Sequence, residues 1–334
     1  MSSLLSLAIG LLPVLVFLVG LIALDSYRLV RLREIVWMLL LGAAAAGMCF
    51  FVNRTALDRG LDPLLLTRYL APAVEETLKG SVVVFLLHRN RIGFLVDAAI
   101  RGFAVGAGFA AIENVQYFLA LTDTDAVLWI LRGFGTAVMH GGVTSMMAVL
   151  AKHATDRSGR ATVRSWLPAL AFAIVLHSLF NHFLLTPHQS AIVLLVLLPI
   201  VFSLVFRSSQ RATRTWLGIG FDTDSELLEM MSSGRTSETR IGVYLSSLRS
   251  RFQPEMLVDM LCLVRLHLEL SVRAKGLLLA REAGFDMEPD ADVRAQLEEL
   301  RHLERTIGRT GNLALKPIFN MSSRDLWQLY LLGE

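Results

Sequence analysis

The feature that most constrains this sequence is a set of ionisable and amide side chains placed inside long apolar segments. In chain order they are Glu75, Glu76, Lys79, Glu113, Asn114, His140, His177 and Asn181. An ionisable group at membrane depth costs about 3 kcal/mol even on the most lenient scale, so it usually faces a protein interior and marks a functional site. We therefore expect four successive apolar helices to bring acids, bases and amides together inside a bilayer.

The composition is that of a chain that lies largely in a membrane. Of its 334 residues, 54% are hydrophobic and 18% are charged, which is too apolar for an ordinary soluble protein. The segments long enough to cross a bilayer as helices are residues 4–24, 35–53, 64–88, 93–121, 126–151, 166–186 and 188–206. The sequence therefore predicts an all-α fold, a polytopic membrane bundle of about seven transmembrane helices. The net charge of +3 shows no footprint of nucleic-acid binding.

Lysine and arginine residues alternate between the loops that connect these segments. The loops after the first, third, fifth and seventh segments hold Arg28, Arg31, Arg33, Arg89, Arg91, Lys152, Arg157, Arg160, Arg164, Arg207, Arg211 and Arg214. The intervening loops are poorer in basic residues. The positive-inside rule then predicts an extracytoplasmic N-terminus, a cytoplasmic C-terminal tail and a place in a bacterial inner membrane.

The polar residues also share a depth in the predicted membrane. At ~1.5 Å per residue from the outer end of each helix, they lie ~13–21 Å deep, from the middle to the outer half of the bilayer. The residues compared in this way are Glu75, Glu76, Glu113, His140 and His177. Unrelated polar residues have no reason to fall in one layer, so we expect them to form one site.

The strongest motif is Glu75-Glu76-x-x-Lys79. On a helix, Lys79 follows the two carboxylates by four and three residues, so its ammonium can reach either. An acid held between a cation and apolar surroundings suits a general base. Pro72 removes a helix hydrogen bond just before the motif and can kink or start it. The alternative is a buried ion pair that only fixes helix packing, but Lys79 can neutralise only one of two carboxylates.

The next three helices add further candidates. Glu113 follows a stretch of small residues that allows close helix packing, and His140 precedes a Gly-Gly pair that clears space. His177 and Asn181 lie one turn apart on one helical face, where both can donate hydrogen bonds to a developing oxyanion. Each residue alone could equally form an ordinary interhelical hydrogen bond.

Carboxylate oxygens and imidazole nitrogens together form a donor set that allows zinc without requiring it. The candidate ligands are Glu76, Glu113, His140 and His177, which leaves Glu75 as base for the water. No His-Glu-x-x-His or Gly-x-Ser-x-Gly motif occurs, and no pair of aspartates lies within the membrane segments. The sequence is therefore unlike the site-2, rhomboid and aspartyl types of intramembrane protease. The two cysteines, Cys49 and Cys262, form no C-x-x-C motif, so a thiolate metal site is not expected.

The order of these motifs resembles the PrsW family of intramembrane proteases, which is similar to the type II CAAX prenyl endopeptidases and the Abi proteins. The resemblance covers residues 64–186 and rests on Glu75-Glu76-x-x-Lys79, Phe109-x-x-x-Glu113, His140 and His177-x-x-x-Asn181. It implies hydrolysis of membrane-anchored proteins such as an anti-sigma factor, and hence a role in signalling. By likeness to the prenyl peptidases, it also implies that Glu75 activates water and that His177 with Asn181 holds the oxyanion. The second motif of those relatives ends in His, whereas here it ends in Glu113, so His140 is a candidate partner of the water.

The predicted organisation is a transmembrane protease domain (residues 1–206), a linker with one or two short turns (207–240) and a cytoplasmic helical domain (241–334). Helices are predicted in the last at 254–283, 290–307 and 323–332. Expected partners are the bilayer, a membrane-protein substrate, and a cytoplasmic protein or a second copy bound through the C-terminal domain. The alternative functions are a proton-coupled transporter or sensor that uses the same buried residues, and a pseudoenzyme that binds membrane partners.

Overall fold

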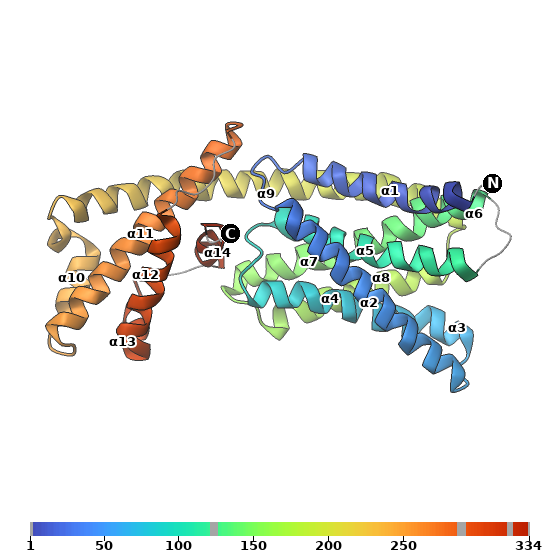
Figure 1. Ribbon diagram of the computed structural model, residues 1–334, viewed down its shortest axis with the longest axis horizontal. Coiled ribbons are helices and arrows are strands. Elements are labelled where there is room, and N and C mark those ends of the chain that lie inside the picture. Colours follow the sequence, from blue (N-terminus) through green and yellow to red (C-terminus); the bar gives the residue numbers. More distant parts are fainter. Residues whose placement is uncertain (1–2, 121–125, 286–291, 319–322, 333–334) are drawn as a thin grey trace. The chain divides into compact units, whose positions relative to one another are not determined.

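The computed structural model describes residues 3–120, 126–285, 292–318 and 323–332 (Figure 1). The chain divides into two compact units, Met1–Gln210 and Arg211–Glu334. All regular structure among the described residues is helical, which confirms the predicted all-α class.

The first unit is a bundle of long helices that carries all the predicted site residues. Its elements are α1 (Ser3–Ala23), α2 (Leu32–Asp58), α3 (Pro63–Leu65), η1 (Leu66–Leu70), α4 (Ala71–His88), α5 (Leu95–Ala120), α6 (Ala126–Leu131), η2 (Arg132–Ala137), α7 (Val138–Ser158), α8 (Val163–Asn181) and the start of α9 (Pro187–Ser232). The elements η1 and η2 are π-helical turns. They join α3 to α4 and α6 to α7 into two uninterrupted helices.

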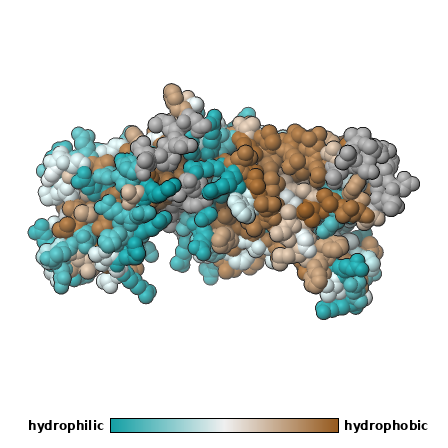
Figure 2. Space-filling model, in the orientation of Figure 1, coloured by the Kyte–Doolittle hydropathy of each residue, from teal (hydrophilic) through white to brown (hydrophobic). Residues whose placement is uncertain are grey.

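Among the described residues, 5 helices are long and apolar enough to cross a membrane. They are α2, α5, α6 with α7, α8, and α9. Large apolar side chains such as Trp37, Phe51 and Leu204 are exposed on their surfaces, and Figure 2 shows hydrophobic residues over much of this unit. The chain is thus a multi-pass membrane protein. For the remaining two predicted spans, 4–24 and 64–88, membrane crossing stays a prediction.

Helix α5 forms the centre of the bundle, where it packs against α1, α2 and α7. The small residues predicted to line a helix interface lie at these contacts. A Cβ atom on Gly106 would lie 2.2 Å from the carbonyl oxygen of His140, and one on Gly42 would lie 1.9 Å from that of Val105. Glycine therefore allows the backbones to approach, and at Gly106 it sets the position of His140.

Pro72 explains the π-helical turn that leads into α4. Proline has no N–H, so the carbonyl of Arg68, four residues earlier, loses its helical donor. The hydroxyl of Ser178 donates to this carbonyl at 2.6 Å, and the Asn181 amide donates to the carbonyl of Thr67 at 2.8 Å. The irregular turn is thereby tied to α8, and the sequence-based expectation that Pro72 disturbs the helix is met in this form. Such π-turns are frequent at functional sites.

The composition at residues 207–240 predicted a linker with short turns, but the structure is helical as far as Ser232. The many serine, threonine and arginine residues obscured a helical pattern in the sequence. The buried positions recur every three or four residues, at Phe202, Phe206, Ser209, Thr213 and Leu217. Helix α9 therefore contains the boundary between the two units.

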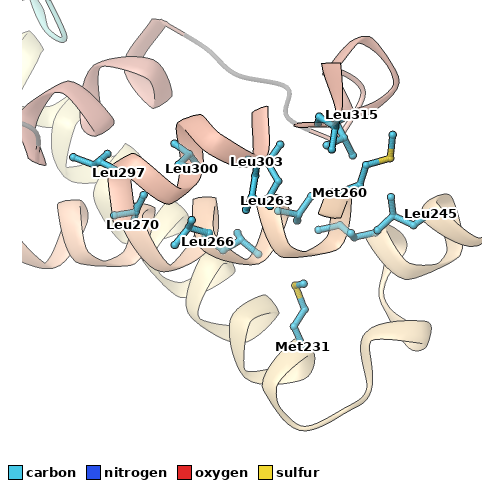
Figure 3. Packing of buried hydrophobic residues seen from close by; sticks show 14 of the residues in the cluster. Met231, Leu245, Met260, Leu263, Leu266, Leu270, Leu297, Leu300, Leu303 and Leu315 are labelled. Carbon is cyan, nitrogen blue, oxygen red and sulfur yellow. The ribbon is translucent and has the colours of Figure 1, made fainter. Parts of the chain in front are cut away.

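The second unit is a small helical domain with its own apolar core. Beyond α9 it contains η3 (Thr236–Glu238), α10 (Arg240–Ser247), α11 (Pro254–Glu282), α12 (Val293–Thr306), α13 (Gly308–Leu315) and α14 (Ser323–Leu332). Met260, Leu263, Leu266 and Leu270 of α11 face Leu297, Leu300 and Leu303 of α12 (Figure 3). The bounds of the three predicted helices agree with those of α11, α12 and α14 to within a few residues, whereas α10 and α13 were not predicted.

Candidate active site

A cavity of about 860 Å³ opens within the first unit and collects most of the predicted site residues. Those that line it are Glu75, Glu113, His140, His177 and Asn181. The cavity follows one face of α2 from Ala46 to Asp58, a helical length of ~18 Å. Glu76 and Lys79 are buried behind its wall. Polar side chains from four helices, α4, α5, α7 and α8, thus line one cavity, as their common depth predicted.

The first half of the site is a chain of contacts from Lys79 through Glu76 to His177. The Lys79 ammonium donates to Glu76 Oε1 at 2.6 Å, and His177 Nδ1 lies 2.8 Å from the same oxygen. Because a carboxylate only accepts, in the neutral ring Nδ1 carries the proton and Nε2 keeps its lone pair. Lys79 and Glu76 are almost fully buried, so these contacts hold the imidazole in one orientation.

The second half repeats the arrangement with Arg132, Glu113 and His140. Arg132 Nη2 forms an ion pair with Glu113 Oε1 at 3.3 Å, without the geometry of a hydrogen bond, and His140 Nε2 lies 2.8 Å from Glu113 Oε2. On the other side of the ring, the Lys79 ammonium approaches His140 Nδ1 at 3.0 Å. An ammonium only donates, so in the neutral ring Nε2 carries the proton and donates it to Glu113. Each histidine is therefore held by a carboxylate that is itself held by a cation.

Glu75 lies between the two halves and, of the three site carboxylates Glu75, Glu76 and Glu113, is the one without a lysine or arginine partner among the described residues. Its Oε2 lies 3.9 Å from His177 Nε2. One ligand atom each from Glu75, His140 and His177 lie within 4.8 Å of one another. The rings of the two histidines meet edge to face with centroids 4.9 Å apart. The three side chains can thus share one small ligand, such as a water molecule or a metal ion.

This cluster differs from the predicted ligand set in its carboxylate. Glu76 was predicted as a ligand, but its Oε1 is engaged by Lys79 and His177, and Glu75 takes the place facing the cavity. Glu113 lies at the edge of the cluster through its contact with His140. The spacing of the motif could not separate Glu75 from Glu76, because Lys79 can reach both on an isolated helix.

Arg132 was not among the predicted site residues, although the rule for charges at membrane depth also applies to it. Arg132 lies inside the predicted span 126–151, where a charged side chain is as costly as at Glu113. In the structure it is 8% exposed, and its Nε donates to Asn114 Oδ1 at 2.8 Å. The predicted role of Asn181 in holding an oxyanion remains a prediction, since one of its amide hydrogens goes to Thr67.

A family model described as PrsW family intramembrane metalloprotease matches residues 31–206. The matched region contains every predicted site residue and more than half of the chain. No curated protein and no solved structure gives a significant match. With the motifs in their expected order around one cavity, the chain belongs to the PrsW family of intramembrane metalloproteases.

Proposed function

We propose that this chain is an endopeptidase that hydrolyses peptide bonds of membrane-anchored regulatory proteins, of the kind represented by anti-sigma factors. The observation that carries the proposal is the cluster of Glu75, His140 and His177 around one point of the cavity. The cavity also suits the substrate, because its length along α2 of ~18 Å would take about five residues of extended chain. The polar side chains in its otherwise apolar lining, such as Asn53, Gln116 and Thr136, offer partners for backbone groups that leave a helix inside the membrane.

In this proposal Glu75 takes a proton from water, and the resulting hydroxide adds to the scissile carbonyl carbon. The C–N bond then breaks as the amine leaves, with the proton returned from Glu75 to its nitrogen. His177 presents Nε2 toward Glu75 and fixes the water. Asn181 keeps a second amide hydrogen for the developing oxyanion, and Glu76 and Glu113 orient the two imidazoles.

The residues also fit the metal that the family name implies. Two imidazoles and one carboxylate are the protein ligands of many catalytic zinc sites. Glu76 contacts Nδ1 of His177, so it orients the ring while Nε2 stays available to a metal, as carboxylates beside metal-binding histidines commonly do. We therefore propose that Glu75, His140 and His177 hold the ion when it is bound, and that Glu75 is then a ligand rather than the base described above. When bound, a zinc ion supplies Lewis acidity and lowers the pKa of water.

The proposed topology follows the charge of the loops. It places seven helices in a bacterial inner membrane, with the N-terminus outside and the second unit in the cytoplasm. The cavity then opens in the outer half of the bilayer. The second unit would serve as a docking site for a cytoplasmic partner or a second copy of the chain. If deleting residues 240–334 leaves processing of a native substrate unchanged, this part of the proposal is wrong.

The test compares cells that produce the wild type with cells that produce Glu75→Gln, by mass spectrometry of new protein N-termini in the membrane fraction. We expect cleavage products that occur with the wild type and disappear in the variant. Glu34→Gln is the matched control, since Glu34 is also a buried glutamate but pairs with Arg101 outside the cavity. If Glu75→Gln produces the same new N-termini as the wild type, the assignment fails. Ion flux that depends on Glu75, without cleavage, would favour a transporter.

A further inference from the structure

We propose that Arg132 is a positioning residue of the active site, which fixes Glu113 toward His140 as Lys79 fixes Glu76 toward His177. The expected effect on kinetics rests on the proposed function, whereas the contacts of Arg132 do not depend on it. Neither the predicted motifs nor the family match assigns a role to Arg132.

The contacts of Arg132 form a route from the first helix of the chain to the catalytic cluster. Asn114 donates through Nδ2 to the carbonyl oxygen of Gly10 at 2.8 Å, and its Oδ1 accepts from Arg132 Nε at 2.8 Å. Arg132 then meets Glu113, and Glu113 meets His140. A single guanidinium thus connects α1 and α5 to the imidazole on α7.

The guanidinium is held on its face as well as its edge. Its carbon lies 3.5 Å from the centroid of the Tyr117 ring, a stacking distance for which arginine is well suited. Arg132 begins the π-helical turn η2, and the chain at Gly133 approaches α1 so closely that a Cβ there would lie 2.3 Å from the carbonyl oxygen of Ile9. These contacts leave little freedom for the side chain, so its charge is presented to Glu113 in a fixed direction.

The charges around the cavity explain why this contact matters. Three carboxylates lie together, at Glu75, Glu76 and Glu113, and Lys79 pairs with Glu76. Without Arg132, Glu113 would keep His140 as its partner among the described residues. A carboxylate that loses its ion pair is free to turn away, and His140 then loses the contact that orients it. Substitutions of such supporting residues typically cost 10–100-fold in activity or metal affinity.

The experiment compares Arg132→Gln and Arg132→Lys with the same two substitutions at Arg101. Arg101 is the matched control because it is also a buried arginine, paired with Glu34 and Asp97 away from the cavity. The substrate is a reporter built from the segment found by the N-terminus mapping. We expect Arg132→Gln to lower kcat by about 10–100-fold with little change in KM, and Arg132→Lys to recover part of the loss. The Arg101 variants should lose thermal stability while the folded protein keeps its kcat.

An infrared measurement tests the geometry without any cleavage. In purified protein, the carboxylate band of Glu113 is identified as the band that Glu113→Gln removes. We expect Arg132→Gln to shift this band, because the carboxylate loses its ion pair, whereas Arg101→Gln leaves it unchanged. An unshifted band overturns the inference whether or not the protein cleaves. If Arg132→Gln shifts the Glu113 band as expected but the wild type has no protease activity, the proposed function alone is refuted. A raised KM at constant kcat would also overturn the inference, because Arg132 would then contact substrate.

Discussion

Replacing Lys79 by methionine tests how the site tolerates charge inside the membrane. Lys79 is 0% exposed, and its ammonium contacts Glu76 at 2.6 Å and His140 at 3.0 Å. Removing one partner of a buried ion pair costs about 3–5 kcal/mol, because the other charge remains buried and unpaired. We expect Lys79→Met to lower the free energy of unfolding by that amount, measured by reversible unfolding in SDS.

A second variant separates this cause from simple loss of packing. In Lys79→Met/Glu76→Gln neither charge remains, and the glutamine oxygen can still accept from His177 Nδ1. We expect the double variant to be at least ~2 kcal/mol more stable than Lys79→Met alone. If it is no more stable, the reasoning from paired charges is refuted. Arg54→Met is the control, because the Arg54–Asp58 pair is exposed, at 71% and 68%, and should contribute less than ~1 kcal/mol.

Three further predictions concern the metal, the helix packing and pH. The wild type should carry about one zinc per chain, and His177→Ala should carry none, as measured by elemental analysis of protein purified without chelator. Gly106→Ala should abolish cleavage by pushing against the carbonyl of His140, while Gly47→Ala, which meets nothing within 4 Å, should leave it intact. Burial raises the pKa of Asp25, in the loop after α1, from 3.8 to about 6. The folded state therefore holds this proton over a range where the unfolded chain has lost it, so stability should fall by up to about 3 kcal/mol as the pH rises through that range. Asp25→Asn should flatten this slope in thermal unfolding between pH 4 and pH 7, and an unchanged slope would contradict the assignment.

The sequence predicted the site more completely than it predicted the contacts within it. Apolar length located the helices, and common depth indicated that Glu75, Glu113, His140 and His177 would meet, because residues in one layer of a bundle face one another. Which carboxylate Lys79 binds could not be read from spacing. That choice depends on His177, 101 residues farther along than Glu76, which reaches the same oxygen.

Arg132 was missed for a different reason. A single arginine near two glycines has no family motif around it, and its partner Asn114 lies 18 residues earlier on another helix. The end of α9 was missed because its buried positions include Ser209 and Thr213, which a hydropathy pattern counts as polar. Only packing shows that small hydroxyl side chains can occupy an apolar stripe.

The membrane setting explains why each histidine contacts a carboxylate, and why each of those two carboxylates, Glu76 and Glu113, is paired with a cation. In a low-dielectric interior an unpaired charge is costly, so the groups that orient His140 and His177 must themselves be neutralised. Lys79 and Arg132 do this for Glu76 and Glu113. Glu75 alone among the three carboxylates lacks a cationic partner among the described residues, and it lines the cavity. The carboxylate that the fold leaves without a cation is thus the one that, in the proposed mechanism, lies beside the water.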